Sequence, residues 1–284
     1  MSLGIIEQLT HSTVRIETTL TNGQISSGTG FLMNFLQSNE HAFPVIITNK
    51  HVISNSAEGR FHFTLAKADG SPDIGNHKQF TYDNFESRWI KHSDPTVDLA
   101  AFLLAPLLNS SADAGSRLFY IPLQTNLIPS NTDRSEFSTM EDVIMIGYPS
   151  GIWDTVNNLP IIRKGITGTH CGTNWNGKTE FLTDIASFPG SSGSPVLIAN
   201  RGSYINKLGT TVMGSNRIRL LGVHYAGFMH TASGEIKIVT APTSNTPIAL
   251  TNIPNNLGLA INSTRILELE TTVAATIGKR WPIS

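Results

Sequence analysis

Alternating apolar and polar positions dominate the first hundred residues of the chain. Residues 13–17 and 61–65 alternate in this way, which predicts strands with one buried face. The continuous apolar runs at 45–47 and 99–104 predict strands that are buried on both faces. Residues 64–91 carry scattered charges, and we expect most of them to form loop and surface. The pattern therefore predicts a β-rich first half.

A second β-rich half follows a stretch with little periodicity. Residues 109–141 hold few regularly spaced apolar residues and several Ser, Asn and Pro, so we expect a connection there. Short apolar runs resume at 143–146 and recur as far as 257–261. We therefore expect two antiparallel β halves, at about 10–108 and about 142–262.

The end of the chain has a helical pattern. Ser263 can cap a helix, and four apolar residues follow at helical spacing before Gly278. These residues are Ile266, Leu269, Val273 and Ile277. Several threonines lower the helix propensity of this stretch, so packing of the apolar face must stabilise it. We expect a C-terminal helix at about 263–278.

Composition excludes several classes of function. The 284 residues are 39% hydrophobic and 14% charged, which argues against disorder. The net charge is −1, so the chain lacks the basic surface of a protein that binds nucleic acid or anionic membrane. A single cysteine, Cys171, excludes an internal disulfide framework. Signal-peptide features and long apolar runs are absent, so a cytoplasmic protein is expected, although a removed leader would be invisible.

One loop could carry a nucleophile. Residues 189–195 hold three serines and two glycines between two prolines. Glycine allows a sharp bend, and a serine in such a bend beside two backbone amides can act as a nucleophile with its oxyanion hole. Taken alone, the same stretch is more typical of an ordinary Gly/Ser hairpin loop.

A serine nucleophile needs a general base and a carboxylate that orients the base. His51 follows a β-branched run, so a rigid strand can position its imidazole. Asp98 stands directly before the apolar run at 99–104. Singly, a histidine of this kind is usually a surface or structural residue, and an aspartate before a strand is usually a turn former.

Taken together, the order His51, Asp98, Ser192 resembles that of the chymotrypsin-fold serine peptidases. Further matching segments are 28–31, 48–53, 97–100, 146–149, 190–195 and 256–261. The resemblance covers nearly all of the chain. It implies one peptidase domain over 1–284, with an all-β fold of two antiparallel six-stranded barrels and a C-terminal helix.

The resemblance also implies roles. Ser192 would attack the scissile carbonyl, His51 would take and return the proton, and Asp98 would orient the imidazole. The backbone N–H groups of Gly190 and Ser192 would form the oxyanion hole. Neither a metal nor an organic cofactor is implied.

Departures from the family pattern narrow the subgroup. Ser191 stands where animal digestive members carry the aspartate of zymogen activation. Ala186 stands where Arg/Lys-cleaving members place a carboxylate, although Asp184 could lie near enough to complicate this. The motifs are similar to those of glutamyl endopeptidases and HtrA-type protease domains. Glutamate-cleaving members have a histidine at the position of His224 and a small hydroxyl residue at that of Ser187.

The segment 222–227 resembles the strand that binds substrate, so Gly222, Val223, His224 and Tyr225 are expected to contribute to the substrate site. For His224 the alternative is a buried histidine that is satisfied by backbone. The stretch 225–256 is long for this connection, and Ile236-Lys237-Ile238 suggests an added hairpin that could shape the cleft or bind a partner.

The expected function is therefore that of a serine endopeptidase that acts on proteins or peptides. Without a leader, disulfides or an activation sequence, we expect an intracellular enzyme under some form of control. A partner protein, a narrow specificity or a misformed oxyanion loop could each provide it. Two alternatives keep the fold: a non-catalytic or latent binding module, and an esterase-like acyl hydrolase.

Overall fold

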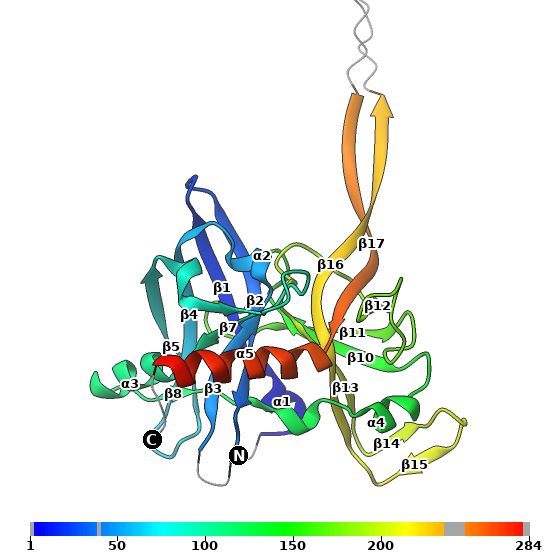
Figure 1. Cartoon of the computed structure of the whole chain (residues 1–284), viewed down its shortest axis with the longest axis horizontal. Helices are drawn as coiled ribbons and strands as arrows, with labels where there is room; N and C mark the ends of the chain where they lie inside the picture. The colour runs from blue at the N-terminus through cyan, green and yellow to red at the C-terminus, as the bar shows by residue number, and fades with distance from the viewer. Residues whose placement is uncertain (1–2, 39–40, 236–247, 281–284) are drawn as a thin grey trace, which may run out of the picture.

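The structure, a computed structural model, describes residues 3–38, 41–235 and 248–280 (Figure 1). Most of the described chain is β-structure. No helix in this part of the chain is long and apolar enough to cross a membrane.

The first half is a nine-stranded sheet with short helices. Its strands are β1 (Thr13–Leu20), β2 (Ile25–Phe35), β3 (Phe43–Thr48), β4 (Ser56–Ala66), β5 (Pro72–Asp83), β6 (Trp89–Lys91), β7 (Ala100–Leu103), β8 (Leu118–Phe119) and β9 (Leu123–Gln124). Its helices are α1 (Ile5–Thr10), α2 (Lys50–Ile53), η1 (Phe85–Arg88), α3 (Ala105–Asp113), η2 (Thr125–Leu127) and α4 (Asn131–Ser135). The strand order is β5-β4-β1-β2-β3-β7-β6, with β8 beside β4 and β9 beside β2.

The expected six-stranded barrel in this half is not what the structure shows. In the described residues the end strands β5 and β6 are not paired with each other. Strand β6 has only three residues, which pair with β7, and η1 separates it from β5. The Phe85 ring of η1 lies against Gly59 of β4. Phe85 is fully buried and packs with Phe61 and Trp89. Aromatic side chains from β4, η1 and β6 thus pack together on one face of this sheet.

The expectation that 64–91 is loop is also wrong, whereas its position at the surface is largely confirmed. Residues 72–83 form β5, which pairs with β4 from Ala66↔Pro72 to Glu58↔Asp83. This strand lies at the sheet edge and is half-buried or exposed throughout, so it shows little apolar alternation.

The second half contains the closed six-stranded barrel that was expected. Its strands follow the order β10-β11-β12-β17-β16-β13. They are β10 (Asp142–Gly147), β11 (Ile161–Thr167), β12 (Glu180–Asp184), β13 (Pro195–Asn200), β16 (Arg217–Glu235) and β17 (Ile248–Asn262). The helix η3 (Pro149–Gly151) follows β10, and β14 (Ser203–Ile205) pairs with β15 (Thr211–Met213) in a separate hairpin.

Strands β16 and β17 extend beyond the barrel as a two-stranded ribbon, which we call the arm (residues 229–235 and 248–254). Their pairing runs from Gly222↔Asn262 at the barrel to Glu235↔Ile248 at the far end of the described part. The arm projects away from the body of the protein (Figure 1). The insertion predicted at 225–256 is thus a hairpin in its described part, whereas Ile236-Lys237-Ile238 lie outside the described residues.

The C-terminal helix α5 (Thr264–Arg280) packs on both halves of the molecule. All four apolar residues with helical spacing are buried. They belong to one hydrophobic cluster that includes Ile47 of the first half and Leu197 of the barrel. Burying a side chain of this size contributes roughly 1.5–3 kcal/mol, so this face stabilises a helix of modest propensity.

The start of α5 differs from expectation. Asn262, rather than Ser263, accepts the first helical amide, with Thr264 N donating to its Oδ1 at 3.0 Å. The Ser263 hydroxyl instead accepts a hydrogen bond from the buried guanidinium of Arg134 at 3.0 Å.

Candidate active site

The ends of two paired strands bring His51 and Asp98 together. Strand β3 pairs with β7 through Thr48↔Ala100, so the residues just beyond this pair face each other. His51 Nδ1 lies 2.5 Å from Asp98 Oδ2, and the backbone N–H of His51 donates to Asp98 Oδ1 at 3.1 Å. Both carboxylate oxygens thus hold one histidine. This places the Nδ1 proton toward Asp98 and leaves Nε2 free to accept a proton.

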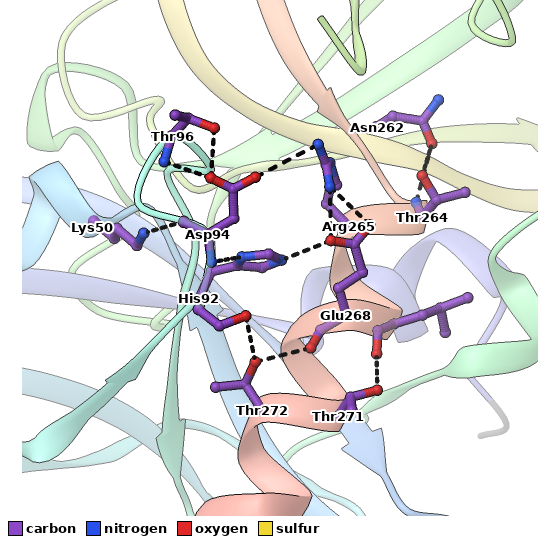
Figure 2. Close-up of polar contacts among 12 residues, drawn as sticks. Lys50, His92, Asp94, Thr96, Asn262, Thr264, Arg265, Glu268, Thr271 and Thr272 are labelled. Atoms are coloured by element: carbon purple, nitrogen blue, oxygen red, sulfur yellow. Dashed lines mark hydrogen bonds and ion pairs between the residues drawn. The ribbon is translucent and has the colours of Figure 1, made fainter.

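The segment from His92 to Thr96, which leads to Asp98, is attached to α5 (Figure 2). Asp94 Oδ1 accepts hydrogen bonds from Thr96 N at 2.9 Å and Thr96 Oγ1 at 2.7 Å. Asp94 Oδ2 lies 3.9 Å from an Arg265 guanidinium nitrogen, and Arg265 also pairs with Glu268. Lys50 Nζ donates to the Asp94 carbonyl at 2.9 Å, which joins this loop to the residue before His51.

A buried histidine is the second attachment of this loop. His92 Nδ1 accepts the Asp94 N–H at 3.0 Å, so its proton resides on Nε2, which lies 3.5 Å from Glu268 Oε2 (Figure 2). Burial lowers the pKa of His92, which favours the neutral ring. Helix α5 therefore positions the Asp98 loop from two points.

Two glycines shape the serine loop. Gly190 and Gly193 both have φ of +88°, a conformation that side chains other than glycine disfavour. A Cβ at Gly193 would collide with the Thr29 carbonyl, and one at Gly190 would collide with the Tyr148 carbonyl. Glycine is thus required at both positions.

Thr29 of β2 fastens this loop across the interface of the two halves. Its N–H donates to Ser192 O at 2.9 Å, and its hydroxyl donates to Gly190 O at 2.9 Å. The same hydroxyl accepts the Tyr148 N–H at 3.0 Å. Thr29 is fully buried, so these bonds are shielded from water. The motif Gly28-Thr29-Gly30 pointed to this segment, but sequence reasoning missed the role of its hydroxyl.

The Pro189–Gly190 peptide has a defined orientation. Ser150 N donates to the Pro189 carbonyl at 2.5 Å. Because C=O and N–H point in opposite directions in a trans peptide, the Gly190 N–H points away from Ser150. Within the described residues, neither Gly190 N nor Ser192 N has a hydrogen-bond acceptor. These are the two amides that the resemblance assigns to an oxyanion hole.

Ser192 itself is not bonded to His51. Its Oγ donates to the Tyr225 carbonyl at 3.3 Å, and no Ser192–His51 hydrogen bond is present among the described residues. A change of the serine χ1 rotamer would redirect Oγ, and such bonds often tighten when substrate binds. The structure thus forms the His51–Asp98 pair and presents Ser192 from the other half.

A pocket of about 160 Å³ adjoins Ser192. Ser187, His224 and Tyr225 line it, together with Gly227 and Phe228. Three of the expected substrate residues therefore meet here. Gly222 and Val223 do not line the pocket, because they pair with Val196 and Pro195 of β13 in the barrel wall.

His224 forms the inner wall of this pocket. It is 1% exposed, and its Nε2 lies 2.7 Å from Ser187 Oγ. Its Nδ1 has no hydrogen-bond partner in the described structure, so its side chain is not satisfied by backbone. Burial, and to a smaller extent the neighbouring His51, lowers the pKa of His224 to about 4. The ring is thus neutral at neutral pH.

Tyr225 also lines a larger pocket of about 460 Å³. Asp98, Tyr225, Glu180 and Arg265 contribute to its walls. Burial and the Glu180 carboxylate raise the pKa of the Tyr225 hydroxyl, which keeps it protonated. Sequence reasoning did not find this pocket, because its residues come from four separate segments. In the described residues no three His, Cys, Asp or Glu side chains gather in a way that could hold a metal ion.

Comparison with known proteins identifies the family. The model of the trypsin-like peptidase domain matches residues 28–205, which is more than half of the chain. The chain therefore belongs to the trypsin-like peptidase family, a family of serine proteases. A search of curated proteins gave no match.

Several solved structures are similar. The HtrA-type protease AlgW with tripeptide is 18% identical, with a TM-score of 0.49 over 94% of this chain and 62% of that chain. The serine endoprotease from Yersinia pestis is 17% identical, with a TM-score of 0.42 over 97% of this chain and 64% of that chain. The active form of the Rv3671c protease from M. tuberculosis is 16% identical, with a TM-score of 0.43 over 93% and 81%. This chain thus spans less than two thirds of the first two proteins.

Proposed function

We propose that this chain is a serine endopeptidase that hydrolyses peptide bonds through an acyl-enzyme, with Ser192, His51 and Asp98 as its triad. The observation that carries the proposal is the pair of backbone amides, Gly190 N and Ser192 N, that flank the serine without an internal acceptor. Backbone amides near the protein interior are almost always paired. A loop that holds two of them free beside a serine favours catalysis over a non-catalytic binding module.

The reaction follows from these positions. Ser192 Oγ leaves the Tyr225 carbonyl, transfers its proton to His51 Nε2 and attacks the substrate carbonyl carbon. The developing oxyanion accepts hydrogen bonds from Gly190 N and Ser192 N, each typically contributing about 2.7–4 kcal/mol to the transition state. His51 then protonates the leaving amine, and a water molecule attacks the acyl-enzyme by the reverse sequence. Asp98 stabilises the imidazolium throughout.

We also propose that the enzyme prefers Glu or Asp on the acyl side of the cleaved bond. The inner wall of the small pocket is polar, with the Ser187 hydroxyl and the His224 ring in contact. These groups can donate hydrogen bonds to a carboxylate. A carboxylate in this pocket would raise the pKa of His224, so binding and protonation would favour each other. A peptide library without preference for acidic residues at this position would contradict this specificity.

Control of the enzyme is a further part of the proposal. A misformed oxyanion hole is the least favoured of the three forms of control. The hydrogen bond from Ser150 N keeps the Pro189 carbonyl turned away from the space that the Gly190 and Ser192 amides face. We therefore propose that the enzyme is cytoplasmic and is controlled in one of the two remaining ways, by a narrow specificity or by a partner protein.

A fluorophosphonate probe tests the nucleophile. Wild type should be labelled at Ser192, and Ser192→Ala should not be labelled. Ser191→Ala is the matched control, because it removes a hydroxyl from the neighbouring residue and should keep labelling. Labelling of Ser192→Ala, or failure of the folded wild type to react, would overturn the assignment. Turnover of casein compared with a simple ester then separates a protease from an esterase-like hydrolase.

A further inference from the structure

Arg134 of α4 is a buried arginine that contacts no carboxylate in the described residues. We propose that its guanidinium binds a small inorganic anion of single charge, such as chloride, where α4 meets the segment 170–173 and the start of α5. None of the residues at this place belongs to the proposed triad, so the anion site does not depend on the proposed function.

The burial of Arg134 sets it apart from the other cationic side chains. Among the lysines and arginines whose exposure the structure describes, Arg134 alone is fully buried, with 4% of its surface exposed. Burial lowers the pKa of its guanidinium, but arginine keeps its proton in proteins. An isolated buried charge is strongly destabilising. A counter-charge is therefore needed beside Arg134.

The neighbouring acidic side chains are engaged elsewhere. Glu141 is the one fully buried carboxylate of the described residues, and both of its oxygens bind Arg217. Asp133 is near enough to attract Arg134, but its Oδ2 accepts Ser130 N at 2.8 Å and Ser130 Oγ at 2.7 Å. In the described part of the chain no ion pair joins Arg134 to a carboxylate. Neither acidic residue therefore compensates the buried charge by contact.

The thiol of Cys171 does not supply the charge either. Arg134 and Cys171 influence each other's pKa, and a Cβ on Gly172 would lie 3.3 Å from Arg134 Cβ, so this segment lies directly against the arginine. Burial nevertheless raises the pKa of Cys171 to about 11. The thiol is therefore neutral at pH 7. An anion from solution is the remaining source of negative charge.

Two nitrogens of the guanidinium are free to bind such an anion. Nη2 donates to Ser263 Oγ at 3.0 Å. Nε and Nη1 of Arg134 are buried and have no hydrogen-bond partner in the described residues. Buried donors are almost always bonded. A water molecule would accept these bonds without offsetting the charge, whereas an anion does both.

The surroundings favour a compact anion of single charge. Arg134 does not line the pocket of about 410 Å³ beside α4, although Asp133 and Phe137 do. A doubly charged anion such as sulfate would leave one negative charge buried without a partner. Chloride carries the single charge that Arg134 requires, and a bare halide needs little space.

The anion would stabilise the junction at which α5 begins. Ser263 accepts the bond from Arg134 and directly precedes α5. Asn262 donates to Cys171 O at 2.8 Å and accepts the Thr264 N–H at the start of the helix (Figure 2). Unfolding would expose Arg134 to water and separate it from these neighbours. Chloride should therefore bind the folded protein alone and raise its stability.

Thermal unfolding in chloride tests the proposal in wild type. The protein is dialysed into sodium gluconate, and sodium chloride then replaces gluconate at constant ionic strength. Tm should rise by about 3 °C for each tenfold increase in chloride above Kd, and bromide should act in the same way. Equal Tm in chloride and in gluconate would overturn the proposal.

Two arginine variants locate the effect. Arg134→Met removes the charge and keeps an unbranched side chain, so its Tm should not depend on chloride. In gluconate its Tm should be at least that of wild type, because no unpaired charge is buried. Arg219→Met is the matched control, since Arg219 lies 3.9 Å from Asp133 of the same helix and its side chain is 35% exposed. It should keep the chloride dependence of wild type, and chloride dependence that survives in Arg134→Met would refute the site.

Bromide in crystals identifies the ligand even if Arg134→Met does not fold. Wild-type crystals grown in sodium bromide should give an anomalous difference peak in hydrogen-bond contact with Nε or Nη1 of Arg134. A water molecule at this place, without an anomalous signal, would exclude the anion. Neither measurement uses peptide hydrolysis, so the anion site and the proposed function succeed or fail separately.

Discussion

Replacing Thr29 by valine should lower kcat through the serine loop, in addition to lowering the free energy of unfolding. The substitution keeps the shape of a fully buried side chain and removes its hydroxyl. Two backbone groups lose their partner, the Tyr148 N–H and the Gly190 carbonyl. Leaving a buried polar group unpaired costs about 1–3 kcal/mol, so the loss of stability should be about 2–6 kcal/mol unless the loop moves.

The loop can lower this cost by releasing Gly190. Such a movement displaces the Gly190 N–H, and loss of one oxyanion donor typically lowers kcat by about 10²–10³-fold. We therefore expect Thr29→Val to lower kcat by about 100-fold or more, with little change in KM. Thr29→Ser keeps the hydroxyl and should retain most of the activity. Peptide hydrolysis kinetics and urea unfolding on the same samples measure both effects.

Thr167 provides the matched control. Its buried hydroxyl also joins two backbone groups, since it donates to Thr139 O at 2.7 Å and accepts Glu141 N at 2.9 Å. Thr167→Val should therefore cost similar stability and leave kcat close to that of wild type. If Thr29→Val lowered stability to the same degree and left kcat unchanged, Thr29 would be a structural residue without a positioning role.

Two further predictions concern buried titratable groups. The pKa of His224 is lowered from 6.5 to about 4 in the folded state, so the unfolded chain binds more protons between these values, and stability should fall as pH drops from about 6.5 to 4. The shift corresponds to about 3 kcal/mol. His62 also has a pKa lowered to about 4, so urea unfolding at pH 7, 5.5 and 4.5 must compare wild type with His224→Gln to isolate this contribution. An equal pH dependence of stability in the two proteins would contradict the burial argument. Burial also raises the pKa of Cys171 to about 11, and the residue is only 1% exposed. Ellman's reagent at pH 8 should therefore react with this thiol only as fast as the protein unfolds. Fast reaction with the native protein would show that the thiol is accessible and contradict the prediction.

The parts of the fold that sequence patterns predicted are those with a buried face. Strands of the barrel alternate or are continuously apolar because their inward side chains are buried in the core. The helical spacing of the apolar residues from Ile266 to Ile277 has the same cause, since this face of α5 is buried as well. Strand β5 was missed because it lies at an edge, where its residues need not be apolar. The missing pairing between β5 and β6 in the described residues was also not predicted, because which strands pair is decided by long-range contacts rather than by the local pattern.

For the site, sequence could predict residue types and their order but not their hydrogen bonds. His51 and Asp98 stand at strand ends, and strand pairing brings such ends together. The bond from Ser192 to Tyr225 depends on a side-chain rotamer, which no sequence pattern encodes. Thr29 and Ser150 act through hydrogen bonds to the backbone of a loop that is distant in the sequence, so their roles follow from the three-dimensional arrangement.

The position of α5 in the chain has a consequence for the timing of activity during translation. This helix is made after both halves, yet its buried face completes a core shared by them. Arg265 and Glu268 of the same helix hold the loop of Asp98. A nascent chain whose residue 277 is still inside the ribosome thus lacks the α5 part of the core shared by the two halves. It also lacks the contacts of Arg265 and Glu268 that hold the loop of Asp98. The peptidase site can therefore be completed only after α5 has left the ribosome.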